Sequence, residues 1–121
     1  MNGKRILIVD DEEYICDLVV DFLALEEISG IKSCDFESAI ERAEKDEFDL
    51  IISDVNIGSF SVERFISTLR NKKIDTAVAL MTGDHRIDDK FAAEIGAVGI
   101  IHKPFQVAPF LAGIKIFLET K

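Results

Sequence analysis

The sequence predicts an α/β fold in which a parallel sheet of five strands carries helices on both faces. Short apolar runs that suit strands buried on both faces alternate with longer stretches in which apolar residues recur at helical spacing. Four of the apolar runs end abruptly at a polar residue. Because right-handed crossovers join successive strands of such a repeat, we expect a parallel, doubly wound sheet.

The size and composition of the chain favour a single domain. With 121 residues, 48% of them hydrophobic, the chain is long enough to bury one core without disulfides or a structural metal. We therefore expect one domain over residues 1–121. The 23 acidic residues outnumber the 14 basic ones and give a net charge of -9, which opposes direct binding to nucleic acid.

The cysteines and the first residues bear on the location of the protein. Cys16 and Cys34 lie far apart, match no metal-ligand spacing and are expected as buried, reduced thiols. The first residues lead straight into an apolar strand rather than into the apolar region of a signal peptide, and no run reaches membrane-spanning length. These features predict a soluble, cytoplasmic protein with no membrane contact.

The first half of the chain contains three expected strands and two expected helices. Residues 5–9 form the first strand, and the acids that follow it suit the amino end of a helix. That helix has apolar residues at the spacing i, i+3, i+4 and i+7, and Gly30 is expected to close it. Its apolar face is Ile15, Leu18, Val19 and Phe22. A weaker strand over residues 31–36, a helix with Ser38 as candidate cap and the strand over residues 50–53 follow. The face of this second helix is Phe36, Ala39, Ile40 and Ala43.

The second half continues the alternation. Residues 56–59 form a turn by composition, and the next helix has an apolar face at full helical spacing, made of Val62, Phe65, Ile66 and Leu69. A strand over residues 77–81 precedes a shorter helix marked by Ile87, Phe91 and Ile95, which Gly96 is expected to end. The last strand covers residues 98–102. Pro109 suits the first turn of the last helix, whose apolar residues are Phe110, Leu111, Ile114, Phe117 and Leu118.

Polar residues stand at the carboxyl ends of four of the expected strands. In order along the chain they are Asp10 with Asp11, Asp54, Thr82 and Lys103. In an open parallel sheet, ligands bind in the crevice outside the carboxyl ends of the strands. We therefore expect three carboxylates, one hydroxyl and one amine to converge on a single site.

The three carboxylates cannot share such a crevice fully ionised without compensation. Two charges about 5 Å apart repel by roughly 3 kcal/mol at an effective dielectric constant of about 20. Either a cation joins Asp10, Asp11 and Asp54, or one of them holds a proton. A Mg²⁺ ion is the simpler answer, because it takes carboxylate, water and phosphate oxygens as ligands. This answer indicates phosphoryl chemistry.

Asp54 is the candidate nucleophile for that chemistry. In-line attack on a phosphoryl donor would give an acyl phosphate, while Lys103 neutralises the transferring oxygens and Thr82 donates a hydrogen bond to one of them. Each residue also has a simpler structural interpretation. Asp10 and Asp11 could cap the first helix, Lys103 could be a surface lysine and Thr82 a strand-end residue. The occurrence of all these residues together favours a shared functional site over the separate structural interpretations.

As a spaced set, these motifs resemble the receiver domain of two-component response regulators. The resemblance covers essentially the whole chain and rests on residues 6–12 (ILIVDDE), residues 50–54 (LIISD), Met81-Thr82 and Lys103-Pro104-Phe105. It implies a flavodoxin-like (βα)5 fold with a doubly wound five-stranded parallel sheet of order 2-1-3-4-5.

The resemblance also implies roles for the site residues. Asp54 is the expected phosphoacceptor, Thr82 the switch hydroxyl and Lys103 the phosphate-binding cation. The metal ligands expected for Mg²⁺ are Asp10, Asp11, Asp54 and the backbone carbonyl of Asn56. A cis peptide bond is expected between Lys103 and Pro104.

Three positions depart from the family pattern or modify it. Gly58 stands where the family commonly has a proline after the acceptor, which predicts a more flexible acceptor loop. Ile100 stands where an aromatic side chain usually rotates inward, so it either packs as an ordinary strand residue or mutes the conformational output. Asp84 lies at the position, two residues beyond Thr82, where the family tunes hydrolysis of the acyl phosphate.

The predicted function is phosphorelay signalling in a two-component system. A sensor histidine kinase or a histidine phosphotransfer protein would donate to Asp54, and the phosphorylated domain would change its binding to a downstream target or output domain. Any enzymatic activity would be limited to self-phosphorylation and autodephosphorylation. The alternative is a protein-interaction module that keeps the fold with little or no phosphorylation-driven switching. An independent phosphatase is disfavoured, because Asn56 stands where that mechanism needs a second acid.

The last helix is unusually apolar for an element that should face solvent on one side. Val107, Ala112 and Ile116 add to its core-facing residues. The helix is therefore either tightly buried or carries an exposed surface for a partner or for a homodimer.

Overall fold

The computed structural model describes residues 3–103 and 105–119, and the main sheet has the predicted order. Its five parallel strands are arranged β2-β1-β3-β6-β7. Taken in chain order, this is the expected order 2-1-3-4-5. The strands are β1 (Arg5–Val9), β2 (Ser29–Ser33), β3 (Leu50–Asp54), β6 (Val78–Thr82) and β7 (Gly99–His102).

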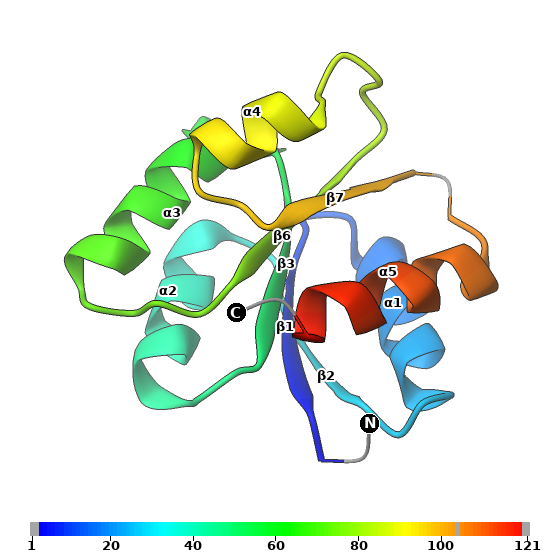
Figure 1. Cartoon of the computed structure of the whole chain (residues 1–121). Helices are drawn as coiled ribbons and strands as arrows, with labels where there is room; N and C mark the ends of the chain where they lie inside the picture. The colour runs from blue at the N-terminus through cyan, green and yellow to red at the C-terminus, as the bar shows by residue number, and fades with distance from the viewer. Residues whose placement is uncertain (1–2, 104, 120–121) are drawn as a thin grey trace.

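In the part of the chain that the structure describes, five helices cover the two faces of this sheet. They are α1 (Glu13–Ala24), α2 (Phe36–Lys45), α3 (Val62–Asn71), α4 (Asp89–Glu94) and α5 (Val107–Glu119). Helices α1 and α5 lie on one side of the sheet, and α2 and α3 lie on the other (Figure 1). The carboxyl ends of the strands therefore open between two helical layers, as a doubly wound fold requires.

Alternation along the central strands produces two separate hydrophobic cores. In β1, the side chains of Ile6 and Ile8 join the core under α1 and α5, whereas Leu7 and Val9 join the core under α2 and α3. All four are fully buried, which explains why the strand is apolar at every position. The unbroken apolar runs in β3 and β6 have the same cause.

The ends of helix α1 correct two predictions. Gly30 does not close the helix but lies in β2, and Glu27 adopts the left-handed conformation at the helix end, with φ 59°. Hydrogen bonds from the N–H of Glu27 to Ala24 and of Ile28 to Leu23 complete a Schellman motif there. Leu18, expected on the buried face, is 37% exposed, and the buried side chains are Ile15, Cys16, Val19 and Leu23.

Two further local features differ from the prediction. The cap of α2 is Asp35, whose carboxylate accepts a hydrogen bond from the N–H of Ser38 at 2.7 Å, so Ser38 is not the cap itself. Cys34 is exposed rather than buried, because it lies in the bend between β2 and α2, whereas Cys16 is buried as expected.

The segment after β3 forms a small hairpin where the sequence predicted only a turn. Strands β4 (Asn56–Ile57) and β5 (Phe60–Ser61) pair antiparallel around Gly58 and Ser59. Gly58 has a φ of 62°, which glycine adopts without strain. Strands of two residues are too short to show a period in the sequence.

Pro104, and with it the expected cis peptide bond, lies outside the described residues. Among the described helices, none combines the length and the apolar character needed to cross a bilayer.

Candidate functional site

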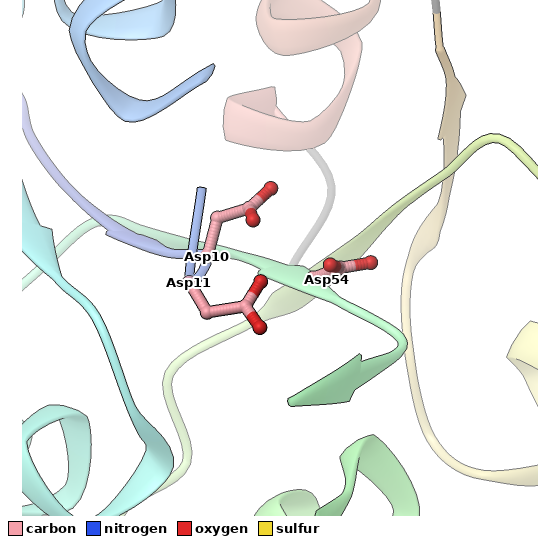
Figure 2. A group of neighbouring side chains, drawn as sticks. All are labelled: Asp10, Asp11 and Asp54. Carbon is pink, nitrogen blue, oxygen red and sulfur yellow. The ribbon is translucent and has the colours of Figure 1, made fainter. Parts of the chain in front are cut away.

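The register of the sheet brings the predicted acids together. Val9 of β1 pairs with Ser53 of β3, so the residues that follow, Asp10 and Asp54, emerge side by side at one edge. One carboxylate oxygen from each of Asp10, Asp11 and Asp54 lies within 4.8 Å of the others. Figure 2 shows the three side chains at the ends of their strands, with their carboxylates directed to the same side.

Asp10 is the buried member of the cluster, and both of its carboxylate oxygens are engaged. Oδ1 accepts a hydrogen bond from the N–H of Glu12 at 2.9 Å, and Oδ2 accepts one from the Nζ of Lys103 at 3.0 Å. The side chain is 0% exposed. The cap position of α1 belongs to Glu12, which makes no side-chain cap bond. Helix capping therefore does not account for Asp10.

Asp54 is partly buried, and one of its two carboxylate oxygens is committed to a hydrogen bond. Its Oδ1 accepts a hydrogen bond from the N–H of Val55 at 2.8 Å, and its Oδ2 faces the Nζ of Lys103 at 3.8 Å. Burial raises the pKa of the Asp54 carboxyl above its ordinary value, and the charges of Asp10 and Asp11 raise it further. The ammonium of Lys103 and the N–H of Val55 oppose this rise in pKa without cancelling it.

Lys103 is the positive charge that holds the acids together. Besides its contacts with Asp10 and Asp54, its Nζ lies 3.7 Å from Oε1 of Glu12. Burial alone would lower the pKa of the ammonium, but the hydrogen bond to Asp10 and the surrounding carboxylates outweigh it, so the pKa is raised. Lys103 therefore stays protonated and ready to contact an anion.

Thr82 ends β6 beside the same edge and is 5% exposed. Its backbone carbonyl accepts a hydrogen bond from the N–H of Lys103 at 2.7 Å, which ties β6 to β7. Its Oγ1 accepts one from the N–H of Asp84 at 3.0 Å. Because the oxygen acts as the acceptor in this bond, the hydroxyl proton is left to donate elsewhere.

The Asp84 carboxylate is engaged by Arg86 rather than by the acid cluster. Arg86 donates to it from its backbone N–H at 2.9 Å and from two guanidinium nitrogens at 3.0 Å each. These hydrogen bonds lower the pKa of Asp84 to about 2. The loop after Thr82 is thus closed on itself, and the negative charge of Asp84 is paired.

Two residues at the site were missed by sequence reasoning. Glu12 approaches Lys103, and a hydrogen bond to Glu12 raises the pKa of the Tyr14 hydroxyl. Tyr14 is 67% exposed and lies at the start of α1, so it stands at the rim of the cluster. The run of acids after β1 was the available signal for Glu12, whereas a tyrosine in the first turn of a helix gives no such signal.

The donor set fits a small, hard divalent cation. Carboxylate oxygens are the ligands that Mg²⁺ prefers, and the 4.8 Å limit on their separation is close to the distance of about 4 Å between opposite ligands of that ion. Asn56, the fourth expected ligand, follows Asp54 by two residues at the start of β4. An arrangement of acids with one protonated lysine and one buried hydroxyl can bind a phosphoryl group through the cation, the ammonium and the hydroxyl proton.

Comparisons with known proteins bear on the family and the fold of this chain. Residues 6–115 match the family model of the response regulator receiver domain. The alkaline phosphatase synthesis transcriptional regulatory protein PhoP of Bacillus subtilis is 32% identical over 118 residues, which are 97% of this chain and 49% of that protein. The chain thus spans about half the length of the curated relatives it matches.

Two solved structures show how closely the fold is shared. The chemotaxis protein CheY4 of Vibrio cholerae is similar with a TM-score of 0.85 and 25% identity, over 94% of this chain and 98% of that one. The response regulator protein TrrA of Thermotoga maritima, in complex with Mg²⁺-BeF, is similar with a TM-score of 0.82 and 25% identity, over 94% and 98% of the two chains.

Proposed function

Because the chain belongs to the response regulator receiver domain family, we propose that Asp54 accepts a phosphoryl group in a two-component signalling system. The observation that carries the proposal is the convergence of Asp10, Asp11 and Asp54 around the ammonium of Lys103 at the carboxyl ends of the strands. We propose the whole chain, residues 1–121, as one receiver domain in the cytoplasm.

The proposed transfer forms a bond between a carboxylate oxygen of Asp54 and the phosphorus of the donor. In the same step, the bond from phosphorus to the leaving group breaks, and the leaving group takes up a proton. Oδ2 is the better placed oxygen, because Oδ1 already accepts the Val55 hydrogen bond. A bound Mg²⁺ would neutralise charge on the acids and on the phosphoryl oxygens.

Lys103 and Thr82 would hold the product. Lys103 lies 3.8 Å from Oδ2 of Asp54, so a small rotation from Asp10 toward the phosphoryl group would give it an anionic partner of higher charge. The free hydroxyl proton of Thr82 would donate to a second phosphoryl oxygen. Because Thr82 also binds the backbone of Lys103 and of Asp84, its displacement would move both loops.

The proposed partners follow from this chemistry. A sensor histidine kinase or a histidine phosphotransfer protein would donate the phosphoryl group, and a downstream target or output domain would respond. The relatives named as transcriptional regulatory proteins are about twice as long as this chain, which supports an output function outside it. The exposed Val107 and Ile116 of α5 support a partner or homodimer surface on the last helix. The net charge of -9 argues against nucleic acid as a direct ligand.

Ile100 is the observation that favours a second candidate, an interaction module with weak switching. Its side chain is partly buried in β7 and packs against the core under α2, α3 and α4. This contact supports the structural interpretation of Ile100, and an isoleucine has no ring to exchange between positions. The two candidates differ in how phosphorylation changes the affinity for the target. A switching domain binds its target with a different affinity once Asp54 is phosphorylated. The interaction module binds with the same affinity whether it is wild type treated with the phosphoryl donor or Asp54→Asn.

The phosphoacceptor proposal is tested by intact-mass spectrometry after incubation with acetyl phosphate. We expect a mass increase of one phosphoryl group in wild type with Mg²⁺, and none in Asp54→Asn or in wild type with the metal chelated. Equal adducts on wild type and Asp54→Asn would overturn the proposal.

A further inference from the structure

The two histidines of the chain lie side by side near the carboxyl ends of β6 and β7. His85 belongs to the loop between β6 and α4, and His102 is the last residue of β7. Their ring centroids are 5.4 Å apart, with 20° between the ring planes. Both side chains are exposed, so an ion and its water ligands can reach them. The fold therefore brings two imidazoles together that are 17 positions apart in the sequence.

A hydrogen bond shows which nitrogen of His102 is free. Its Nε2 lies 3.3 Å from the backbone carbonyl of Ile87. A carbonyl oxygen only accepts, so Nε2 carries the hydrogen of this bond, and the lone pair of the neutral ring is on Nδ1. Histidines that bind metals in proteins usually donate their other N–H to a carbonyl or a carboxylate. The ring of His102 is thus already oriented as that of a metal ligand would be.

The separation of the two rings suits one shared ion. A bond from Zn²⁺ to an imidazole nitrogen is about 2.1 Å long, and the ring centre lies about 1.1 Å beyond that nitrogen. Two imidazoles on one tetrahedral ion therefore have their ring centroids about 5 Å apart. The 5.4 Å between the rings of His85 and His102 is close to this distance.

The type of ligand separates this pair from the acid cluster. Imidazole nitrogens favour zinc, nickel and copper, whereas carboxylate oxygens favour magnesium. Asp84, the acid that precedes His85, has both carboxylate oxygens engaged by Arg86 and is not available as a third ligand. The chain thus offers two nitrogen ligands here, and water would complete the coordination of an ion.

We propose that His85 and His102 bind a divalent transition-metal ion, best Zn²⁺, through one ring nitrogen each. The ion would join the loop that follows Thr82 to the carboxyl end of β7. The inference goes beyond the proposed phosphoryl transfer and does not depend on it, because neither histidine belongs to the acid cluster.

The test is calorimetric titration of the whole chain with Zn²⁺, in excess Mg²⁺ to compete for the carboxylates and with the thiols kept reduced. We expect one Zn²⁺ per chain. His85→Phe and His102→Phe should each weaken binding by about tenfold or more, because the second nitrogen no longer adds an intramolecular contact. Phenylalanine keeps a ring at the position and removes the ligand. Cys34→Ser and Asp54→Asn, which alter other candidate ligands, should bind Zn²⁺ as wild type.

Proton NMR of the wild type adds a measurement that needs no variant. One equivalent of Zn²⁺ should shift the ring Cε1–H resonances of both histidines together. A shift of only one resonance, or binding no tighter than the millimolar range, would overturn the proposal. An affinity for Zn²⁺ that is unchanged in either phenylalanine variant, or that falls equally in Cys34→Ser or Asp54→Asn, would overturn it as well.

Discussion

At the scale of single residues, Lys103 is the positive charge that faces the acids of the site. Its ammonium lies 3.0 Å from Asp10, 3.7 Å from Glu12 and 3.8 Å from Asp54, and only 16% of its side chain is exposed. The positive charge of Lys103 therefore faces three carboxylates of the site. The sequence predicted Lys103 at the site, but the fact that its hydrogen bond goes to Asp10, with Asp54 farther away at 3.8 Å, depends on side-chain positions that no sequence pattern encodes.

Replacing Lys103 should therefore destabilise the fold. Lys103→Met leaves the carboxylate of Asp10, which is 0% exposed, without its cation, and we expect a loss of about 3 kcal/mol in the free energy of unfolding. Saturating Mg²⁺ should recover part of this loss, because it supplies positive charge to the same oxygens. Urea denaturation with and without Mg²⁺ measures both effects. A loss that is the same with and without Mg²⁺ would contradict the account.

Removing the charge of Asp54 should change the free energy of unfolding in the opposite direction. Asp54→Asn is expected to raise the free energy of unfolding by about 1 kcal/mol at pH 7 without Mg²⁺, because it relieves repulsion from Asp10 and Asp11. Burial raises the pKa of Asp54, so the folded state holds this proton more firmly than the unfolded state. Wild type thus gains stability as pH falls through this titration, and the variant does not.

The advantage of Asp54→Asn over wild type should accordingly be larger at pH 7 than at pH 3. Thermal or urea unfolding at the two pH values, in chelator, gives the comparison. An Asp54→Asn protein that is less stable than wild type at pH 7 would show that Lys103 outweighs the repulsion.

At the scale of elements, the strands were predictable and the connections were less so. Burial on both faces leaves an unbroken apolar run in the sequence, which made β1, β3 and β6 predictable. Helix α3 was predictable because its four buried residues recur at helical spacing. The end of α1 was misassigned because Glu27, not a glycine, takes the left-handed position. The β4–β5 hairpin was missed because two-residue strands depend on tertiary anchors, here Phe36 and Arg64.

Gly30 shows what the misassigned glycine does instead. A Cβ at this position would lie 3.0 Å from Cδ1 of Ile8 and 3.1 Å from Cγ2 of Val20, so glycine lets α1 approach β2 closely. Gly30→Ala should destabilise the protein by about 1–2 kcal/mol through overpacking.

Gly113 provides the matched control for this prediction. It lies inside α5, with nothing within 4 Å of an added Cβ. Gly113→Ala should stabilise the protein by about 0.5–1 kcal/mol, because alanine is the better helix former. Equal effects of the two substitutions in urea denaturation would contradict the packing role of Gly30.

At the scale of the whole molecule, the topology explains why five polar residues scattered over the sequence meet. Parallel strands place all their carboxyl ends at one edge, and the order β2-β1-β3-β6-β7 sets β3, with Asp54, between the strands that end at Asp10 and Thr82. This part of the site followed from the sequence. The closed loop of Thr82, Asp84 and Arg86, and the approach of Glu12 to Lys103, arise only from the folded chain.

The central claim is that Asp54, and not a neighbouring acid, takes the phosphoryl group. The most direct measurement is to treat the phosphorylated protein with borohydride, which reduces an aspartyl phosphate to homoserine, and to locate the homoserine by peptide mass spectrometry. The account predicts homoserine at position 54 alone. Homoserine at Asp10 or Asp11, or its absence in a protein that carries the phosphoryl adduct, would contradict it.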